Sequence, residues 1–135
     1  MENYNLTFTE DELFLSLTTN INQINENLFL GNQSAAGYTP DFENEIIKKS
    51  NIFNSKQNLI NFGITAIICC ADNLELMRED FSYLLLPLKD KPKFPIKQYF
   101  SQSFDFIEEH IQKGGKVLIH CNAGATRSAT ITISY

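Results

Sequence analysis

One cysteine, one glycine, one arginine and one serine stand at close spacing near the end of the chain, in the stretch HCNAGATRS. This stretch begins at His120 and follows the apolar run Val117–Ile119, which is typical of a buried strand. We expect Cys121 where the strand ends, and the next residues to wrap around one point with their backbone N–H groups aimed inward. A helix beginning near Arg127 or Ser128 would direct the positive end of its dipole to the same point.

These residue types describe a nucleophile at the bottom of a pocket for a dianion. A thiol among N–H donors loses its proton easily, so Cys121 would be a thiolate. Gly124 lets the loop close tightly, and the planar guanidinium of Arg127 fits two phosphate oxygens. Ser128 can donate its hydroxyl to the sulfur. The arrangement suits phosphoryl transfer through a phosphocysteine; the alternative is that Cys121 is a small buried residue at a strand end.

Such a mechanism requires a proton donor for the leaving oxygen, and a positioned carboxylic acid is worth roughly 10²–10⁴-fold in rate. Asp90 is the candidate, because it follows directly on the strand-like run Tyr83–Leu88. It would then act as the base on the attacking water. Asp72 and Asp80 are weaker candidates, since neither stands in that pattern. The alternative for Asp90 is a solvated loop residue.

The HCNAGATRS loop resembles the signature of the cysteine-based protein phosphatases, in particular the dual-specificity group, whose loop commonly reads HCxxGxSRS. Thr126 stands where that group usually has its first serine, and it keeps the hydroxyl. The segment YLLLPLKD resembles the family's strand-then-Asp segment, and INQINENLFLG resembles its entry strand. The chain has no Trp, so the Trp-Pro-Asp loop of the tyrosine-specific phosphatases is absent, which favours the dual-specificity group.

The resemblance implies a phosphatase that acts on phosphotyrosine and phosphoserine or phosphothreonine in protein substrates, without a cofactor or a metal. It implies catalytic roles for Cys121, Arg127, Asp90 and Ser128, and a supporting role for His120. It also implies that phosphate is bound by the loop residues Asn122, Ala123, Gly124, Ala125, Thr126 and Arg127.

Three other functions stay open. The first is an inactive relative that captures phosphorylated proteins, against which the presence of Cys121, Arg127 and Asp90 argues. The second is an enzyme on phosphoinositides or RNA 5′-triphosphates; such relatives commonly carry basic residues in the loop, whereas the variable loop positions here carry none. The third is a rhodanese-type sulfur carrier, which the His-Cys and Arg-Ser frame fits poorly.

Composition sets outer bounds on the function. The 135 residues point to one domain, and 43% apolar with 20% charged residues is ordinary for a soluble globular protein. A net charge of −5 argues against general binding to nucleic acid or to an acidic membrane. The sequence shows neither a membrane span nor a signal peptide, so we expect a cytoplasmic or nuclear protein. The oligomeric state stays open.

Three cysteines form neither a disulfide framework nor a zinc-binding spacing. Cys69 and Cys70 are most simply core residues of a strand. One of them could serve as a resolving thiol for Cys121 under oxidation.

Strand and helix patterns alternate along the chain, which predicts an α/β fold with a central, partly parallel sheet flanked by helices. The loop would lie at the carboxyl end of a strand, where open α/β sheets bind ligands. Besides Val117–Ile119, we predict strands at Leu28–Gly31, Ile64–Cys70 and Tyr83–Leu88, a short helix at Gln57–Gly63 and a long helix from Pro95 to Gly114.

We divide the chain into an acidic segment, residues 1–20, and a phosphatase-like catalytic domain, residues 21–135. Residues 37–58 exceed what the family usually has there, and we expect a surface insertion or a partner-contacting loop with a weak helix signal at Glu43–Lys49. The family domain continues past the loop helix, so we expect an incomplete C-terminus lacking the family's last helices. The β-branched stretch Ser128–Tyr135 is a poor helix former, and we expect exposed apolar surface around it and the central strands.

The densest basic run in the chain flanks Asp90. In an acidic protein this run localises positive potential beside the pocket, and we expect it to steer acidic phosphopeptides. A solvated loop face is the alternative. The run consists of Lys89, Lys91, Lys93 and Lys97.

Overall fold

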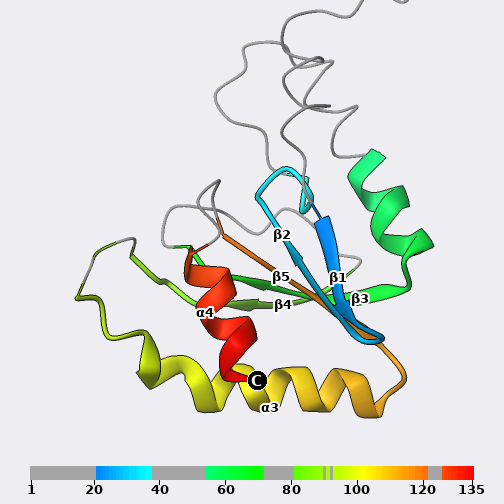
Figure 1. Cartoon of the computed structure of the whole chain (residues 1–135). Coiled ribbons are helices and arrows are strands. Elements are labelled where there is room, and N and C mark those ends of the chain that lie inside the picture. The colour runs from blue at the N-terminus through cyan, green and yellow to red at the C-terminus, as the bar shows by residue number, and fades with distance from the viewer. Residues whose placement is uncertain (1–20, 38–53, 72–80, 90, 92, 122–125) are drawn as a thin grey trace, which may run out of the picture.

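The computed structural model describes residues 21–37, 54–71, 81–89, 91, 93–121 and 126–135. These residues build one mixed sheet with helices on both faces (Figure 1). The sheet order is β1-β2-β5-β3-β4. The β1–β2 pair is antiparallel, and the β2–β5, β3–β5 and β3–β4 pairs are parallel, which confirms the predicted fold class. The strands are β1 (Ile21–Asn25), β2 (Leu28–Gly31), β3 (Ile64–Cys69), β4 (Ser82–Leu85) and β5 (Lys116–His120).

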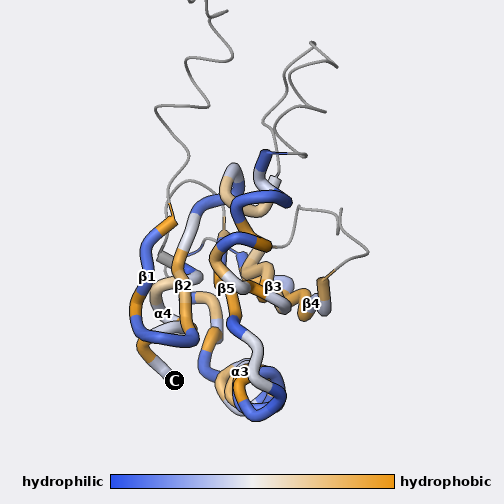
Figure 2. The backbone as a smooth tube through the Cα atoms, turned by 90° about the vertical axis from the view of Figure 1, so that its right-hand side faces the viewer, coloured by the Kyte–Doolittle hydropathy of each residue, from blue (hydrophilic) through white to orange (hydrophobic). Residues whose placement is uncertain are grey.

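The middle of the sheet is formed by β5 and β3, whose interior residues are apolar and buried. Parallel strands that are covered on both faces have continuous apolar sequences. The interior residues of β5 are fully buried, as this requires. Figure 2 shows hydrophobic colour along β3 and β5, whereas the edge strand β1 is largely hydrophilic.

Side chains of β5 alternate between two clusters, as the two-residue period of a strand requires. Val117 and Ile119 pack with Ile107 of α3 (Phe100–Gln112) and Ile131 of α4 (Thr126–Ser134). Leu118 points to the other face, where it joins the cluster that contains Leu59 of the helix at 54–61. The functional loop therefore leaves a strand that is fixed from both sides.

The predicted helices form, with shifted starts. The long helix opens as a 3₁₀ turn, η1 (Ile96–Tyr99), before α3 begins. The short helix spans 54–61 rather than starting at Gln57, and the hydroxyl of buried Ser55 donates to the Ser34 carbonyl at 3.1 Å. This tertiary contact holds an extra turn that the local pattern does not indicate. The predicted helix signal at Glu43–Lys49 lies outside the described residues.

The structure adds one strand to those predicted and shortens another. The hairpin β1–β2 includes a polar first strand, and its turn is closed by the Asn27 N–H, which donates to the side chain of Asn25 at 2.8 Å. The β4 strand ends at Leu85 rather than Leu88. Beyond it the Leu88 N–H donates to the Leu86 carbonyl at 2.7 Å, which closes a tight turn around Pro87.

The β-branched stretch near the C-terminus forms the helix α4, although its residues have a poor helix propensity. Ile131 is fully buried against the sheet, and the Thr132 hydroxyl donates to the Ser128 carbonyl at 2.8 Å within the helix. Tertiary packing therefore decides its conformation. Ile133 is 84% exposed, as expected around this helix. The expectation that the central strands are exposed is wrong, because α3 and α4 cover them.

Candidate active site

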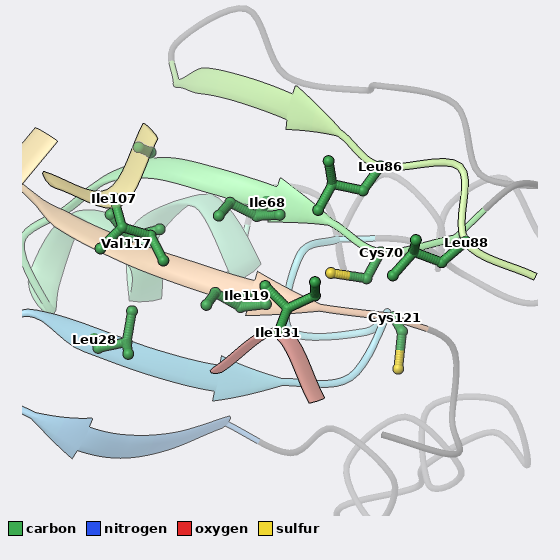
Figure 3. Close-up of a cluster of buried hydrophobic side chains, with 11 residues drawn as sticks. Leu28, Ile68, Cys70, Leu86, Leu88, Ile107, Val117, Ile119, Cys121 and Ile131 are labelled. Carbon is green, nitrogen blue, oxygen red and sulfur yellow. The ribbon is translucent and has the colours of Figure 1, made fainter. Parts of the chain in front are cut away.

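The predicted nucleophile lies at the carboxyl end of the central strand. Cys121 follows β5 directly and precedes α4, which begins at Thr126. Figure 3 shows its side chain beyond the end of β5, close to Ile131 of α4. This is the edge of a parallel sheet where ligands bind in open α/β folds.

The remaining loop residues are not described by the structure. Asn122, Ala123, Gly124 and Ala125 lie outside the described residues, as does the side chain of Thr126. Their predicted phosphate-binding role stays a prediction.

The Cys121 sulfur and the Ser128 hydroxyl are brought together by the strand, the loop and the first turn of α4. The Sγ and Oγ atoms lie 3.1 Å apart, and both side chains are buried. At this distance the hydroxyl can donate a hydrogen bond to a thiolate, which stabilises the sulfur as a leaving group.

Arg127 links the loop to the segment that leads to Asp90. Its side chain is buried, and Nη1 donates to the Leu88 carbonyl at 2.8 Å. A buried guanidinium makes this end of the sheet electropositive, which favours an anion. Asp90 lies outside the described residues, but the structure places Leu88, two positions before it, in contact with Arg127.

The side chain of His120 points away from that of Cys121 and contacts the Cys121 backbone. Its ring is fully buried, and Nδ1 lies 3.3 Å from the Cys121 carbonyl. Burial lowers the pKa of His120 from 6.5 to about 4, so the ring is neutral at pH 7. A neutral ring with its proton on Nδ1 donates to that carbonyl and fixes the backbone of the nucleophile, in line with the predicted supporting role.

One contact at this site was not predicted, and a second was predicted only as a choice between Cys69 and Cys70. The Leu88 carbonyl is a backbone group, so no residue type could indicate that it holds Arg127. Cys70 lies near Cys121 because of the register between β3 and β5, in which Cys69 pairs with His120. This register cannot be read from the sequence alone. The candidates Asp72 and Asp80 lie outside the described residues.

Neither a metal centre nor a membrane helix is found in the part of the chain that the structure describes. There, no group of His, Cys, Asp and Glu side chains could hold a metal ion. Among the same residues, no helix is long and apolar enough to cross a membrane.

Comparisons with known proteins point to one family. A family model for the dual specificity phosphatase catalytic domain matches residues 46–135. The chain is 43% identical over 79 residues to serine/threonine/tyrosine-interacting protein A of Xenopus laevis, covering 54% of this chain and 35% of that protein. It is 39% identical over 72 residues to human dual specificity protein phosphatase 15, covering 53% of this chain and 24% of that protein.

Solved structures show the same fold. The human tyrosine phosphatase-like serine/threonine/tyrosine-interacting protein superposes with a TM-score of 0.66 at 33% identity, over 84% of this chain and 69% of that one. The DUSP15 structure gives a TM-score of 0.65 at 28% identity, over 83% of this chain and 61% of that one.

The matched relatives are longer than this chain. The chain spans 35% of the first curated relative and 24% of the second. The family match begins at residue 46, so the predicted domain boundary at residue 21 stays a prediction. Over the matched residues the assignment is plain: the chain belongs to the dual-specificity phosphatase family.

Proposed function

We propose that this chain is a protein phosphatase that hydrolyses phosphotyrosine and phosphoserine or phosphothreonine through a phosphocysteine intermediate. Family membership supports the phosphatase class. The finer proposal is carried by one observation, the 3.1 Å contact between Cys121 Sγ and Ser128 Oγ at the end of β5. A core cysteine would not require a buried hydroxyl against its sulfur.

The proposed reaction has two steps. The Cys121 thiolate attacks phosphorus, the bond from phosphorus to the substrate oxygen breaks, and that oxygen takes the proton of Asp90. Water then attacks the phosphocysteine while Asp90 takes its proton, and the sulfur leaves as a thiolate that accepts a hydrogen bond from Ser128. Arg127 balances the charge of the phosphoryl oxygens in both steps.

A thiolate nucleophile requires a reducing compartment. We therefore propose a cytoplasmic or nuclear location and phosphorylated proteins as the substrates.

The second candidate function is a module that binds phosphorylated proteins without turnover. It is favoured by the likeness to a protein described as tyrosine phosphatase-like and as interacting with serine, threonine and tyrosine. The retained Cys121 and its contact with Ser128 favour the enzyme.

Hydrolysis of p-nitrophenyl phosphate by the purified chain tests the proposal. We expect turnover by the wild type, the background rate for Cys121→Ser, and wild-type turnover for Cys69→Ala as a buried-thiol control. The serine variant keeps Arg127, so it should still bind a phosphotyrosine peptide in calorimetry. Turnover by a clean Cys121→Ser preparation would refute the phosphocysteine mechanism. Phosphopeptide binding without hydrolysis by the wild type would favour the binding module.

A further inference from the structure

The acidic segment, residues 1–20, joins the sheet at the edge that holds Cys121. It leads directly into β1, which begins at Ile21. Ile21 pairs with Gly31 of β2, and Gly31 pairs with His120, the last residue of β5. In Figure 3 the blue strand β1 accordingly begins on the side of the sheet where β5 ends. The segment is therefore attached at the carboxyl ends of the parallel strands, two strands away from β5.

The same edge carries cations that are open to solvent. The bond from Arg127 to the Leu88 carbonyl holds the start of the basic run at this edge. The run ends at Lys97 in η1, which packs against α4, the helix that carries Arg127. All four lysines of the run are exposed. Among the described residues none of the four has a carboxylate partner, so this surface is available to an anionic segment.

Residues 1–20 have the opposite charge and sufficient length. They lie outside the described residues, and their sequence contains no Lys or Arg but three consecutive carboxylates, Glu10, Asp11 and Glu12. Nine positions separate Glu12 from Ile21, and nine extended residues span at most about 30 Å. The distance from β1 to β5 is two strand spacings, roughly 10 Å. The three carboxylates can therefore reach the basic run without any change in the sheet.

We propose that the acidic segment binds the basic run of the same chain through Glu10, Asp11 and Glu12, and competes there with phosphorylated substrates. The effect on activity rests on the proposed function. The contact itself rests only on the charges and on the point where the segment joins the sheet.

Tethering makes such a contact effective although each pair is weak. Exposed ion pairs contribute little individually, but a short tether holds the segment at an effective concentration of about millimolar. The competing cation at this edge is Lys56, because the neighbouring Ser55 bonds to the Ser34 carbonyl just after β2. Lys56 is half-buried, whereas the lysines of the basic run are exposed, so the run is the better partner.

The first test is carbodiimide cross-linking of the purified chain at low salt, which joins carboxylates to lysine amines that lie in contact. We expect links from Glu10, Asp11 or Glu12 to the basic run in chains of monomer mass, located by proteolysis and fragment mass spectra. The proposal would be overturned by links that join two chains, by links mainly to Lys56 or Lys113, or by the absence of links from these carboxylates.

The second test removes the charges of the segment and leaves its length unchanged. The variant Glu10→Gln/Asp11→Asn/Glu12→Gln should lower KM about threefold to tenfold at low salt for a phosphotyrosine peptide with uncharged flanks. Its kcat should stay at the wild-type value, because the carboxylates compete with the substrate and take no part in the reaction. A KM equal to that of the wild type would contradict the proposed competition.

A matched variant controls for net charge. Glu26→Gln/Asp105→Asn/Glu109→Gln removes three exposed carboxylates elsewhere. Glu26 lies in the β1–β2 turn at the opposite edge of the sheet, and the other two lie on α3. This variant should keep the wild-type KM. An equal fall in KM in both triple variants would reduce the effect to overall charge and overturn the assignment to the acidic segment.

Failure of the proposed function would look different from failure of this inference. A chain that is not a phosphatase would hydrolyse no peptide, while the cross-links would still report on the contact. The Cys121→Ser variant supplies a readout without turnover, since neutralising the three carboxylates should lower its calorimetric Kd for the same phosphopeptide by the same factor. An unchanged Kd together with the expected cross-links would show that the segment does not compete with substrate, and would overturn the proposal.

Discussion

In the proposed mechanism the Ser128 hydroxyl matters most when the sulfur leaves, because it lies 3.1 Å from Cys121 Sγ in the same buried site. We predict that Ser128→Ala slows breakdown of the phosphocysteine about tenfold to a hundredfold, as expected for loss of a hydrogen bond to a charged group worth about 1.5–3 kcal/mol. Rapid-quench kinetics should show a burst of product followed by slow turnover. Ser134→Ala, which removes a hydroxyl from the same helix, should leave both phases unchanged. A uniform loss without a burst would place Ser128 in the first step.

His120 makes the fold sensitive to mild acid. Its pKa is lowered by burial from 6.5 to about 4, so the unfolded chain binds a proton between these values that the folded chain does not. Stability from the neutral ring is therefore present above pH 6.5 and is lost as the pH falls toward 4. We predict a loss of about 2 kcal/mol in unfolding free energy between pH 7 and pH 5. Urea denaturation at the two pH values measures it, and His120→Asn should reduce the difference.

At the scale of residues, the spacing in the sequence was enough to predict that the Cys121 sulfur and the Ser128 hydroxyl meet. Seven positions separate Cys121 from Ser128, and a strand, a tight loop and a first helical turn leave little freedom in where the two meet. The contact from Arg127 to the Leu88 carbonyl and the hydrogen bond from the Cys70 N–H to the His120 carbonyl depend on which strands are neighbours. That information lies in the strand order, which no local pattern contains.

The turn between α3 and β5 determines how β5, the strand that precedes the candidate site, enters the sheet. At Gly115 an added Cβ would lie 3.0 Å from the His110 carbonyl and would collide with the Thr65 hydroxyl. At Gly114 nothing lies within 4 Å, but φ is +82°. We predict that Gly115→Ala costs about 1–3 kcal/mol through overpacking. Gly114→Ala should cost about 1 kcal/mol through backbone conformation alone.

The two glycine variants can be separated by a double-mutant cycle measured in urea. Thr65→Ala removes the hydroxyl that the new methyl group would strike, so it should recover part of the loss in Gly115→Ala and none of the loss in Gly114→Ala. Equal recovery in both variants would show that Thr65 acts on the turn rather than on the added methyl group.

Elements were predictable from the sequence where hydrophobic burial fixes them. The apolar runs of β3 and β5 could be recognised because both faces are covered, and the long helix because its apolar residues recur at helical spacing. The edge strand β1 is held by backbone pairing to β2 rather than by burial, so its polar sequence gives little signal. The conformation of α4 is decided by the buried Ile131 against its β-branched composition.

Charge is distributed unevenly over the whole molecule. The net charge is −5, and residues 1–47 contain no Lys or Arg. The lysines around Asp90 are exposed where the structure describes them, and the bond from Arg127 to the Leu88 carbonyl holds the start of their segment at the site. Lys113, by contrast, lies at the C-terminal end of α3, just before β5 begins. It forms an ion pair with Glu109.

This distribution predicts electrostatic steering of acidic phosphopeptides toward the site. Added salt should lower kcat/KM for a phosphopeptide with acidic flanks several-fold, because exposed charges are screened beyond about 10 Å at 0.1 M salt. Lys89→Glu and Lys91→Glu should do the same at low salt, chiefly by raising KM. Lys113→Glu changes the net charge equally at the other end of the sheet, so it should have little effect. If kcat/KM is unchanged by salt and Lys113→Glu matches Lys89→Glu, the run is a solvated surface with no part in substrate capture.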